Sequence, residues 1–162
     1  MGSSPAFAIV FCIECWQRLT PSEKLNEGIR GRIRHMCKTI KHKVRFKAPP
    51  EKIYGLLAES RARTEVTGRE SVMSDKIGGK FSTDAGEVTG VNVDLVPGRR
   101  LVQAWRRKDF PEGIYSMAAI TLASTPSGGT ELVLTHRGVP KHLLDQIEDY
   151  WRNVCWTPMK KR

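Results

Sequence analysis

The sequence has no long hydrophobic run, and this absence limits where the protein can reside. No stretch of about 18 consecutive apolar residues occurs, which is near the minimum for a transmembrane helix. The apolar run from Ala6 to Ile13 is short and no charged region precedes it, so it does not match a secretory signal. With 162 residues, 40% of them hydrophobic, the chain is predicted to be cytoplasmic, to lack a membrane span and to form one globular core.

Motifs of known catalytic chemistry are also absent. The sequence contains no nucleophile elbow, zinc-protease helix, phosphate-binding loop or dinucleotide fingerprint. Glu148 and Asp149 are adjacent on an expected helix, so they point in different directions. His136 falls on an inward strand face, where a lone histidine is either a general base or a pocket residue with satisfied hydrogen bonds. We predict no catalytic residue and no enzymatic activity.

Cysteine is scarce, with four residues in the chain. Cys12 and Cys15 form a C-x-x-C pair, but a structural zinc site needs a second pair, which Cys37 and Cys155 do not make. The strand–helix–strand context of a redox pair is missing as well. A chain of this length buries a core without a disulfide framework. The sequence therefore predicts no metal and no cofactor.

Acidic residues are outnumbered by basic ones, 17 against 27, which gives a net charge of +10. Such an excess suggests an acidic partner, either nucleic acid, an anionic membrane or an acidic protein, and the alternative is simply a well-solvated surface. The basic residues are scattered and aromatic residues are not interleaved with them, a pattern that does not favour nucleic-acid binding. The pattern leaves an acidic protein, an anionic membrane surface and a solvated surface without a partner as alternatives.

The first 35 residues differ in character from the rest. The stretch from Thr20 to Arg34 mixes charge with glycine and shows no clean helical stripe. Met36 follows directly, at the start of a recognisable domain. We therefore divide the chain into an irregular extension, residues 1–35, and a domain, residues 36–162. The extension is either an upstream reading-frame addition absent from the native protein or a real, poorly ordered arm.

Within the domain, strand patterns dominate. Thr39 to Phe46 alternates apolar and charged residues, which predicts a half-buried strand. Glu51 to Glu59 follows two prolines and is typical of a helix, and Arg61 to Gly68 predicts a short second helix ended by glycine. Further strand-like runs are separated by turn signals. They are residues 71–74, 80–83, 87–95, 100–107, 114–123 and 130–137.

Alternation along these strands assigns one side of each to the core. In 87–95 the expected inward residues are Val91, Val93 and Leu95. In the later strands the inward residues are Leu101, Gln103, Trp105, Ala118, Ile120, Leu122, Leu132, Leu134 and His136. Short turns without crossover helices predict an antiparallel meander.

The last segment, Lys141 to Met159, carries apolar residues at helical spacing. A sheet of this length must cover one of its faces, and this segment is the only element long enough to do so. The fold class predicted is α+β, with a curved antiparallel sheet wrapped around a long C-terminal helix.

Motifs in this order resemble a known superfamily. Phe46 to Glu51, Ile53-Tyr54, Ile77 to Phe81 and Gly90 to Leu95 are similar to the START-like (SRPBCC) helix-grip superfamily. Later motifs resemble, more narrowly, the C-terminal domain of the activator of the heat-shock-protein-90 ATPase. They are Trp105, Pro111-Glu112-Gly113, Gly129 to Leu132, Gly138-Val139-Pro140 and Trp151…Trp156.

The resemblance spans about residues 39–160 and implies a helix-grip fold with an apolar cavity between sheet and helix. It also implies a chaperone as partner, although residues 1–38 are too few for the separate N-terminal domain of a full co-chaperone.

Two hypotheses follow. In the first, the protein binds a small apolar ligand in an enclosed cavity of a few hundred Å³, where His136 or Gln103 orients one polar group. In the second, it is a protein-interaction module that acts on a chaperone through its basic surface and stimulates the partner's ATPase. The ligand-binding candidates of the first hypothesis are Tyr54, Phe81, Gln103, Trp105, Ile120, Leu134, His136, Leu144, Ile147 and Trp151.

Overall fold

The computed structural model describes residues 37–110 and 113–162. The strands are β1 (Cys37–Phe46), β2 (Lys80–Thr83), β3 (Val88–Val96), β4 (Arg100–Arg107), β5 (Ser116–Ser124) and β6 (Thr130–Pro140). The helical elements are α2 (Pro50–Ala58), α3 (Ser60–Thr67), η3 (Lys141–Leu143), α4 (Leu144–Asp149), η4 (Tyr150–Trp156) and α5 (Thr157–Met159). The predicted extension, residues 1–35, and the Cys12–Cys15 pair lie outside the described residues, so that division of the chain stays a prediction.

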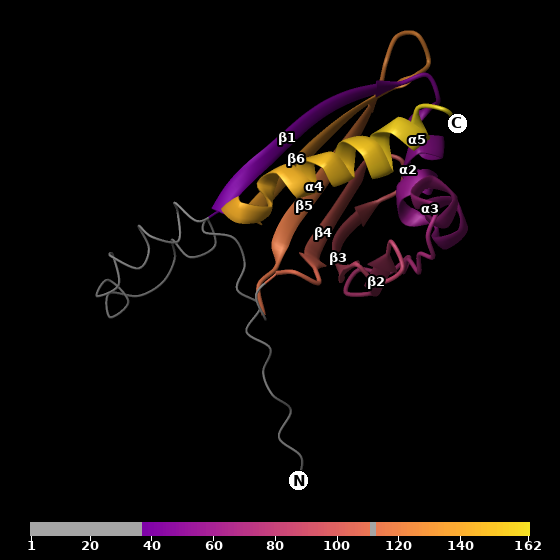
Figure 1. Cartoon of the computed structure of the whole chain (residues 1–162). Helices are drawn as coiled ribbons and strands as arrows, with labels where there is room; N and C mark the ends of the chain where they lie inside the picture. The colour runs from indigo at the N-terminus through magenta and orange to yellow at the C-terminus, as the bar shows by residue number, and fades with distance from the viewer. Residues whose placement is uncertain (1–36, 111–112) are drawn as a thin grey trace, which may run out of the picture.

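The strands form one six-stranded antiparallel sheet in the order β1-β6-β5-β4-β3-β2. Strands β2 to β6 follow one another as a meander, and β1 closes the other edge by pairing with β6 (Figure 1). The predicted antiparallel meander is confirmed, and short turns are sufficient to connect its strands because consecutive strands are neighbours.

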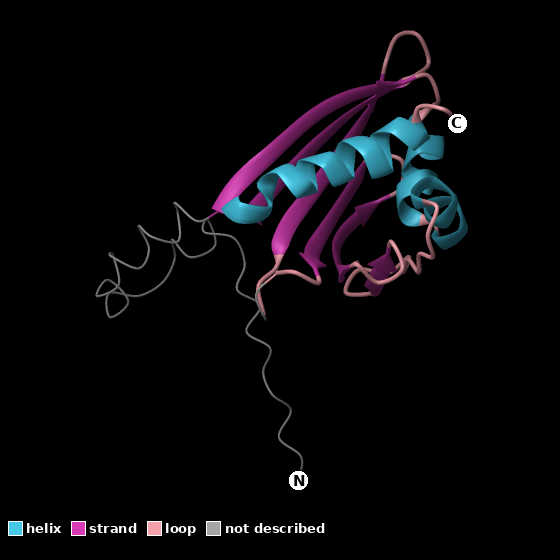
Figure 2. Ribbon diagram, in the orientation of Figure 1, coloured by secondary structure: helices cyan, strands magenta, loops and turns pink. Residues whose placement is uncertain are grey.

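All the described helices lie on one face of the curved sheet (Figure 2). The C-terminal helix, from η3 to α5, crosses this face alongside β1 and β6, while α2 and α3 lie beside its C-terminal end. This arrangement confirms the predicted α+β helix-grip fold. We call the face that carries the helices the inner face, and the opposite side the outer face.

Local sequence explains where the short helices begin and end. Pro50 occupies the first turn of α2, where its missing N–H needs no partner. Gly68 ends α3 in the left-handed conformation, with φ of 70°, as the sequence predicted. The main-chain N–H of Gly68 bonds to Thr64 O at 2.9 Å and closes the last turn.

The predicted inward face of β3 is wrong at Val91 and Val93, whereas Leu95 does pack against the core. The buried residues of this strand are Val88, Gly90 and Asn92, whereas Val93 is 38% exposed. The cause is an irregularity between Asn92 and Asp94, where the β3–β4 register shifts. Asn92 tolerates burial because its amide donates to Ser74 O at 2.7 Å and its oxygen accepts from Gln103 Nε2 at 3.0 Å.

The run 71–74, predicted as a short strand, is reduced to a single bridge. Val72 exchanges two main-chain hydrogen bonds with Ser82, at 2.7 and 2.8 Å, and no strand extends from this pair. The bridge partly covers the edge of β2.

The C-terminal helix is not a regular α-helix along its length. From Tyr150 to Trp156 it is a π-helix, whose wider turn brings residues five apart toward one face. Trp151 and Trp156 consequently stack, with ring centroids 5.2 Å apart and planes at 18°. Both rings point into the core, where Trp151 is 2% and Trp156 4% exposed.

Candidate functional site

The predicted ligand-binding residues occupy the inner face and the helix above it. The fully or nearly fully buried ones are Phe81, Gln103, Trp105, Ile120, Leu134, His136, Ile147 and Trp151. Tyr54 and Leu144 are half-buried and pack against the edge of the core. All ten lie on the helix side of the sheet, which strand alternation predicted for five of them, Gln103, Trp105, Ile120, Leu134 and His136.

These residues do not enclose the expected cavity. Phe81, Gln103, Trp105, Ile120 and Trp151 do surround a common void, but its volume is about 10 Å³. A void of that size has room for about one water molecule, whereas small-molecule sites have several hundred Å³. Tyr54, Leu134, His136, Leu144 and Ile147 do not line this void. The ligand hypothesis required a cavity of a few hundred Å³, and the void among these residues falls far short of it.

Both ring nitrogens of His136 form hydrogen bonds within the core. Its Nδ1 accepts from Trp151 Nε1 at 2.9 Å, so Nε2 carries the proton and donates to Ser116 Oγ at 2.6 Å. The Ser116 hydroxyl in turn donates to the main-chain oxygen of Trp105 at 3.0 Å. Burial lowers the pKa of His136 to about 3, which keeps the ring neutral. No lone pair or proton is left for a ligand or a substrate, so the pairing favours a structural role over catalysis.

A second histidine makes a similar contact nearer the surface. His42 of β1 accepts from Trp156 Nε1 through Nδ1 at 2.9 Å. Burial, reinforced by the charge of Arg152, lowers the pKa of His42. The His42–Trp156 and His136–Trp151 pairs attach the π-helical segment to β1 and β6. These two strands are neighbours in the sheet, where Ile40 of β1 lies opposite His136 of β6.

The outer face presents a different surface, which can be followed in rows across the sheet because residues in register point to the same side. The first row is Lys80, Val91, Ala104, Met117 and Arg137. The second row is Asp94, Val102, Ala119, Thr135 and Lys41. The third row is Val96, Arg100, Thr121, Val133 and Lys43.

The first two rows have small or apolar residues in the middle and a basic residue at one end or both. Asp94, at the other end of the second row, forms an ion pair with Arg100 of the third row, which ends in Lys43. A solvent-facing antiparallel sheet normally alternates to polar residues on this side. Here no described element covers the face, and Val91, Val102, Met117 and Val133 stay half-buried by their strand neighbours alone. Contiguous apolar residues with a polar rim are typical of interaction surfaces. We refer to these three rows as the outer-face band.

A groove opens at the β2 end of the outer-face band. It has a volume of about 420 Å³ and contains the apolar side chains of Val72, which is 57% exposed, and Val91. Lys80 and Tyr115 add a charge and a phenol to its wall. The complete lining is Val72, Lys80, Phe81, Ser82, Thr89, Gly90, Val91 and Tyr115.

At the opposite edge the outer face is positively charged. Glu131 forms ion pairs with Lys43 at 2.9 Å and with Arg45 at 3.1 Å. Hydrogen bonding from Lys43, and secondarily from Arg45, lowers the pKa of Glu131. One carboxylate therefore serves two cations, and the exposed Lys41 in the same strand adds a further positive charge. Electrostatically this edge favours an acidic partner.

Sequence reasoning missed the outer-face band because it assigned one side of each strand to the core and left the other to solvent. A usable signal was present in β5, where Met117, Ala118, Ala119 and Ile120 are apolar in succession. A continuous apolar run of this kind indicates a strand covered on both faces.

The described residues contain no candidate metal cluster and no candidate membrane-spanning helix. No group of three or more histidine, cysteine or carboxylate side chains comes together there as a metal site. Neither does any helix of residues 37–110 or 113–162 have the length and hydrophobicity needed to cross a membrane.

Comparison with known proteins gives the family. Residues 47–161 match the family model described as activator of Hsp90 ATPase homolog 1-like protein. The chain belongs to this family. The match covers α2 through α5 and so includes most of the sheet and the whole C-terminal helix. It confirms the START-like resemblance drawn from the sequence.

Relatives of this family are similar over a limited part of their length. An activator of 90 kDa heat shock protein ATPase homolog from Dictyostelium discoideum is 30% identical over 118 residues, which are 72% of this chain and 31% of that protein. The activator of 90 kDa heat shock protein ATPase homolog 1 from Mus musculus is 28% identical over 147 residues, 91% of this chain and 43% of that protein. The chain thus spans less than half the length of these family members.

Among solved structures, an HSP90 activator from Plasmodium falciparum superposes with a TM-score of 0.65 at 24% identity. The superposition covers 74% of this chain and 90% of that one. At this level of identity the likeness establishes the fold that the two family domains share. The family members with which the chain was compared are named as activators of an ATPase, not as catalysts themselves.

Proposed function

We propose that this chain is a non-enzymatic protein-interaction domain that docks on a chaperone ATPase of the 90-kDa heat-shock class through its outer-face band. The observation that carries the proposal is the apolar, cation-flanked outer face, which no described helix covers. The relatives' names supply the chaperone class. The inner face, by contrast, is a closed core whose central void holds about 10 Å³.

The partner's docking surface is expected to be acidic with an apolar centre. Lys41 lies at one end of the second row and Lys80 at one end of the first, on opposite edges of the sheet, and both are exposed. An acidic surface approaching the outer-face band is attracted by these flanks and then buries the valines and alanines between them. The net charge of +10 speeds the encounter at low ionic strength.

The test is a binding titration of the chain with a purified chaperone of this class, followed by measurement of the chaperone's ATPase rate. The double variant Lys41→Glu with Lys80→Glu reverses the charge at the two flanks of the outer-face band. It is expected to weaken binding about tenfold or more at low salt. Lys160→Glu combined with Lys161→Glu makes the same net charge change at the exposed C-terminus and is the matched control.

The two double variants separate a specific site from bulk charge. The proposal requires the flank variant to lose affinity while the C-terminal variant stays within about twofold of the wild type. Equal losses of affinity in both variants would show that the interaction is a general charge attraction. Unchanged affinity in both variants would show that the outer-face band is not part of the interface.

A further inference from the structure

Two buried side-chain nitrogens of the described residues have no hydrogen-bond partner, His42 Nε2 and Arg63 Nη1, and Arg63 is the one that carries a permanent charge. Arg63 of α3 is 4% exposed, and its Nη2 donates to Tyr150 Oη at 3.3 Å and to Cys155 Sγ at 3.2 Å. Its Nη1 is buried and has no hydrogen-bond partner. A guanidinium is always charged, and burying that charge among neutral partners is costly unless an anion accompanies it.

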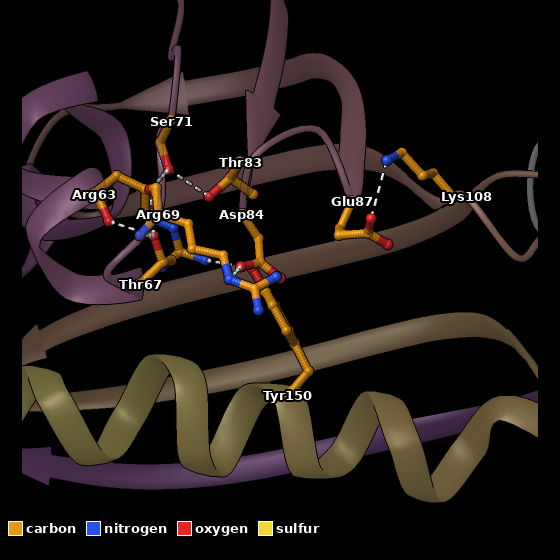
Figure 3. Close-up of polar contacts among 9 residues, drawn as sticks. All are labelled: Arg63, Thr67, Arg69, Ser71, Thr83, Asp84, Glu87, Lys108 and Tyr150. Atoms are coloured by element: carbon orange, nitrogen blue, oxygen red, sulfur yellow. Dashed lines mark hydrogen bonds and ion pairs between the residues drawn. The ribbon is translucent and has the colours of Figure 1, made fainter.

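The described acidic side chains do not supply that anion. Figure 3 shows Asp84 in the same corner as Arg63, but Asp84 forms its ion pair with Arg69, at 3.5 Å. No ion pair with Arg63 exists among the described residues. Burial raises the pKa of both the Cys155 thiol and the Tyr150 phenol, so both partners of Nη2 are neutral at pH 7.

Arg63 also lines the void of about 10 Å³ at the centre of the core. Two further polar residues line it. Gln103 uses one amide hydrogen on Asn92 Oδ1 at 3.0 Å and keeps the second. Thr83 shares a hydrogen bond with Ser71 at 2.8 Å, and when Ser71 is the donor the Thr83 hydrogen is available. The remaining lining is apolar, and includes Met73 and Phe81.

We propose that this void binds a monovalent anionic group on Nη1 of Arg63, either a free halide ion or the carboxylate head of an apolar molecule. The volume suits an ion close to water in size. A carboxylate with an apolar tail requires the half-buried Met73 side chain to move aside. Either source supplies the negative charge that the buried guanidinium lacks.

Thermal unfolding at constant ionic strength tests the proposal, with sodium bromide replacing sodium methanesulfonate, whose anion is larger than bromide and carries no carboxylate. Because an anion bound only to the folded state stabilises it by mass action, the midpoint should rise by about 3 °C for each tenfold increase in bromide above the dissociation constant. A midpoint that does not respond to bromide overturns the proposal.

The variant Arg63→Met removes the charge and keeps an apolar chain of similar length. It should abolish the response to bromide. The control is Arg61→Met, since the Arg61 side chain is 94% exposed on the same helix and its loss should leave the response intact. A bromide response of wild-type size in Arg63→Met rules out the site.

Two measurements on the wild-type protein decide the question even if Arg63→Met fails to fold. Crystals soaked in bromide should show an anomalous peak within hydrogen-bond distance of Arg63 Nη1, and absence of the peak counts against the proposal. Ultraviolet absorbance of the thiolate should show Cys155 protonated at pH 7. A Cys155 thiolate at that pH would itself neutralise the Arg63 guanidinium and would contradict the proposal.

A series of carboxylates then distinguishes the two sources. If acetate and decanoate at equal concentration raise the midpoint equally, the ligand is a small free anion. A rise with decanoate that greatly exceeds the rise with acetate assigns the site to the head of an apolar molecule. Both results require the effect to vanish in Arg63→Met.

Discussion

The two faces of the sheet are built from the same strands but differ in burial. On the inner face, Leu132 and Leu134 are fully buried beneath the C-terminal helix, and His136 places both of its nitrogens in hydrogen bonds. On the outer face, Val133 and Thr135 of the same strand stay half-buried with no described element over them. If the outer face is the docking surface that we propose, alternation along one strand separates stability from recognition: changes inside should unfold the protein, and changes outside should weaken its interactions.

Substitutions at two adjacent residues of β6 test the difference between the two faces most directly. Leu134→Ala removes a side chain with 0% exposure from the core and should reduce the free energy of unfolding by about 3 kcal/mol. Val133→Ala, on the opposite side of the same strand, should cost less than about 1 kcal/mol. Urea unfolding of the two variants beside the wild type measures both. Similar losses in the two variants would show that the outer face contributes to the core as much as the inner one.

The second prediction concerns the pH dependence that the inner face imposes. His136 has a pKa of about 3 in the folded protein, below the 6.5 of the unfolded chain, because burial disfavours the charged ring. The unfolded state therefore binds more protons between these values, and stability is lost as the pH falls below about 6.5. From pH 7 to pH 5 the loss attributable to His136 should be about 2 kcal/mol.

Comparison with His136→Gln isolates this contribution, because His42 has a lowered pKa as well and acts in the same direction. The variant should lose about 2 kcal/mol less than the wild type between these pH values. His142→Gln, at an exposed position in η3 at the start of the C-terminal helix, is the control and should follow the wild type. Direct titration of the imidazole by NMR serves if the variant does not fold, and a ring that protonates near pH 6 contradicts the prediction.

The inner face was largely predictable from sequence, and the reasons lie in particular strands. From Leu101 to Trp105 and from Leu132 to His136 the inward residues alternate as predicted, because the register shift in β6 lies beyond His136, between His136 and Val139. In β3 the register shift after Asn92 reverses the pattern, and the sequence gives only a polar residue as a warning. That polar residue is buried because the loop from Ser74 to Lys76 accepts its amide hydrogens, a contact that depends on the tertiary fold.

The closed interior was not predictable in the same way. Tyrosine and tryptophan at inward positions suit a ligand pocket as well as a solid core, because both provide apolar bodies with polar tips. What closes the core is the fit of Trp105 against Trp151, with ring centroids 6.1 Å apart, and of Trp151 against Trp156. That second contact depends on the π-helical turn, which helical spacing in the sequence does not reveal.

The smallest effect is expected on the outer face, at Glu131. Its ion pairs with Lys43 and Arg45 are exposed, so Glu131→Gln should lower the melting temperature only slightly, and only at low ionic strength. In about 1 M salt, where the Debye length is about 3 Å, the variant and the wild type should melt together. The pKa of Glu131 is lowered by these partners, so the contribution is present above the unfolded-state pKa of 4.5 and disappears as the pH falls.

Any lost carboxylate increases the self-repulsion of a chain whose net charge is +10, so the measurement needs a carboxylate outside the ion pairs as its control. Glu70→Gln changes the same charge at an exposed position that forms no ion pair with another described residue. If Glu131→Gln and Glu70→Gln lower the melting temperature equally, the loss reflects total charge alone. A greater, salt-sensitive loss in Glu131→Gln shows that the paired cations of β1 are held in place on the outer face, where an acidic partner would meet them.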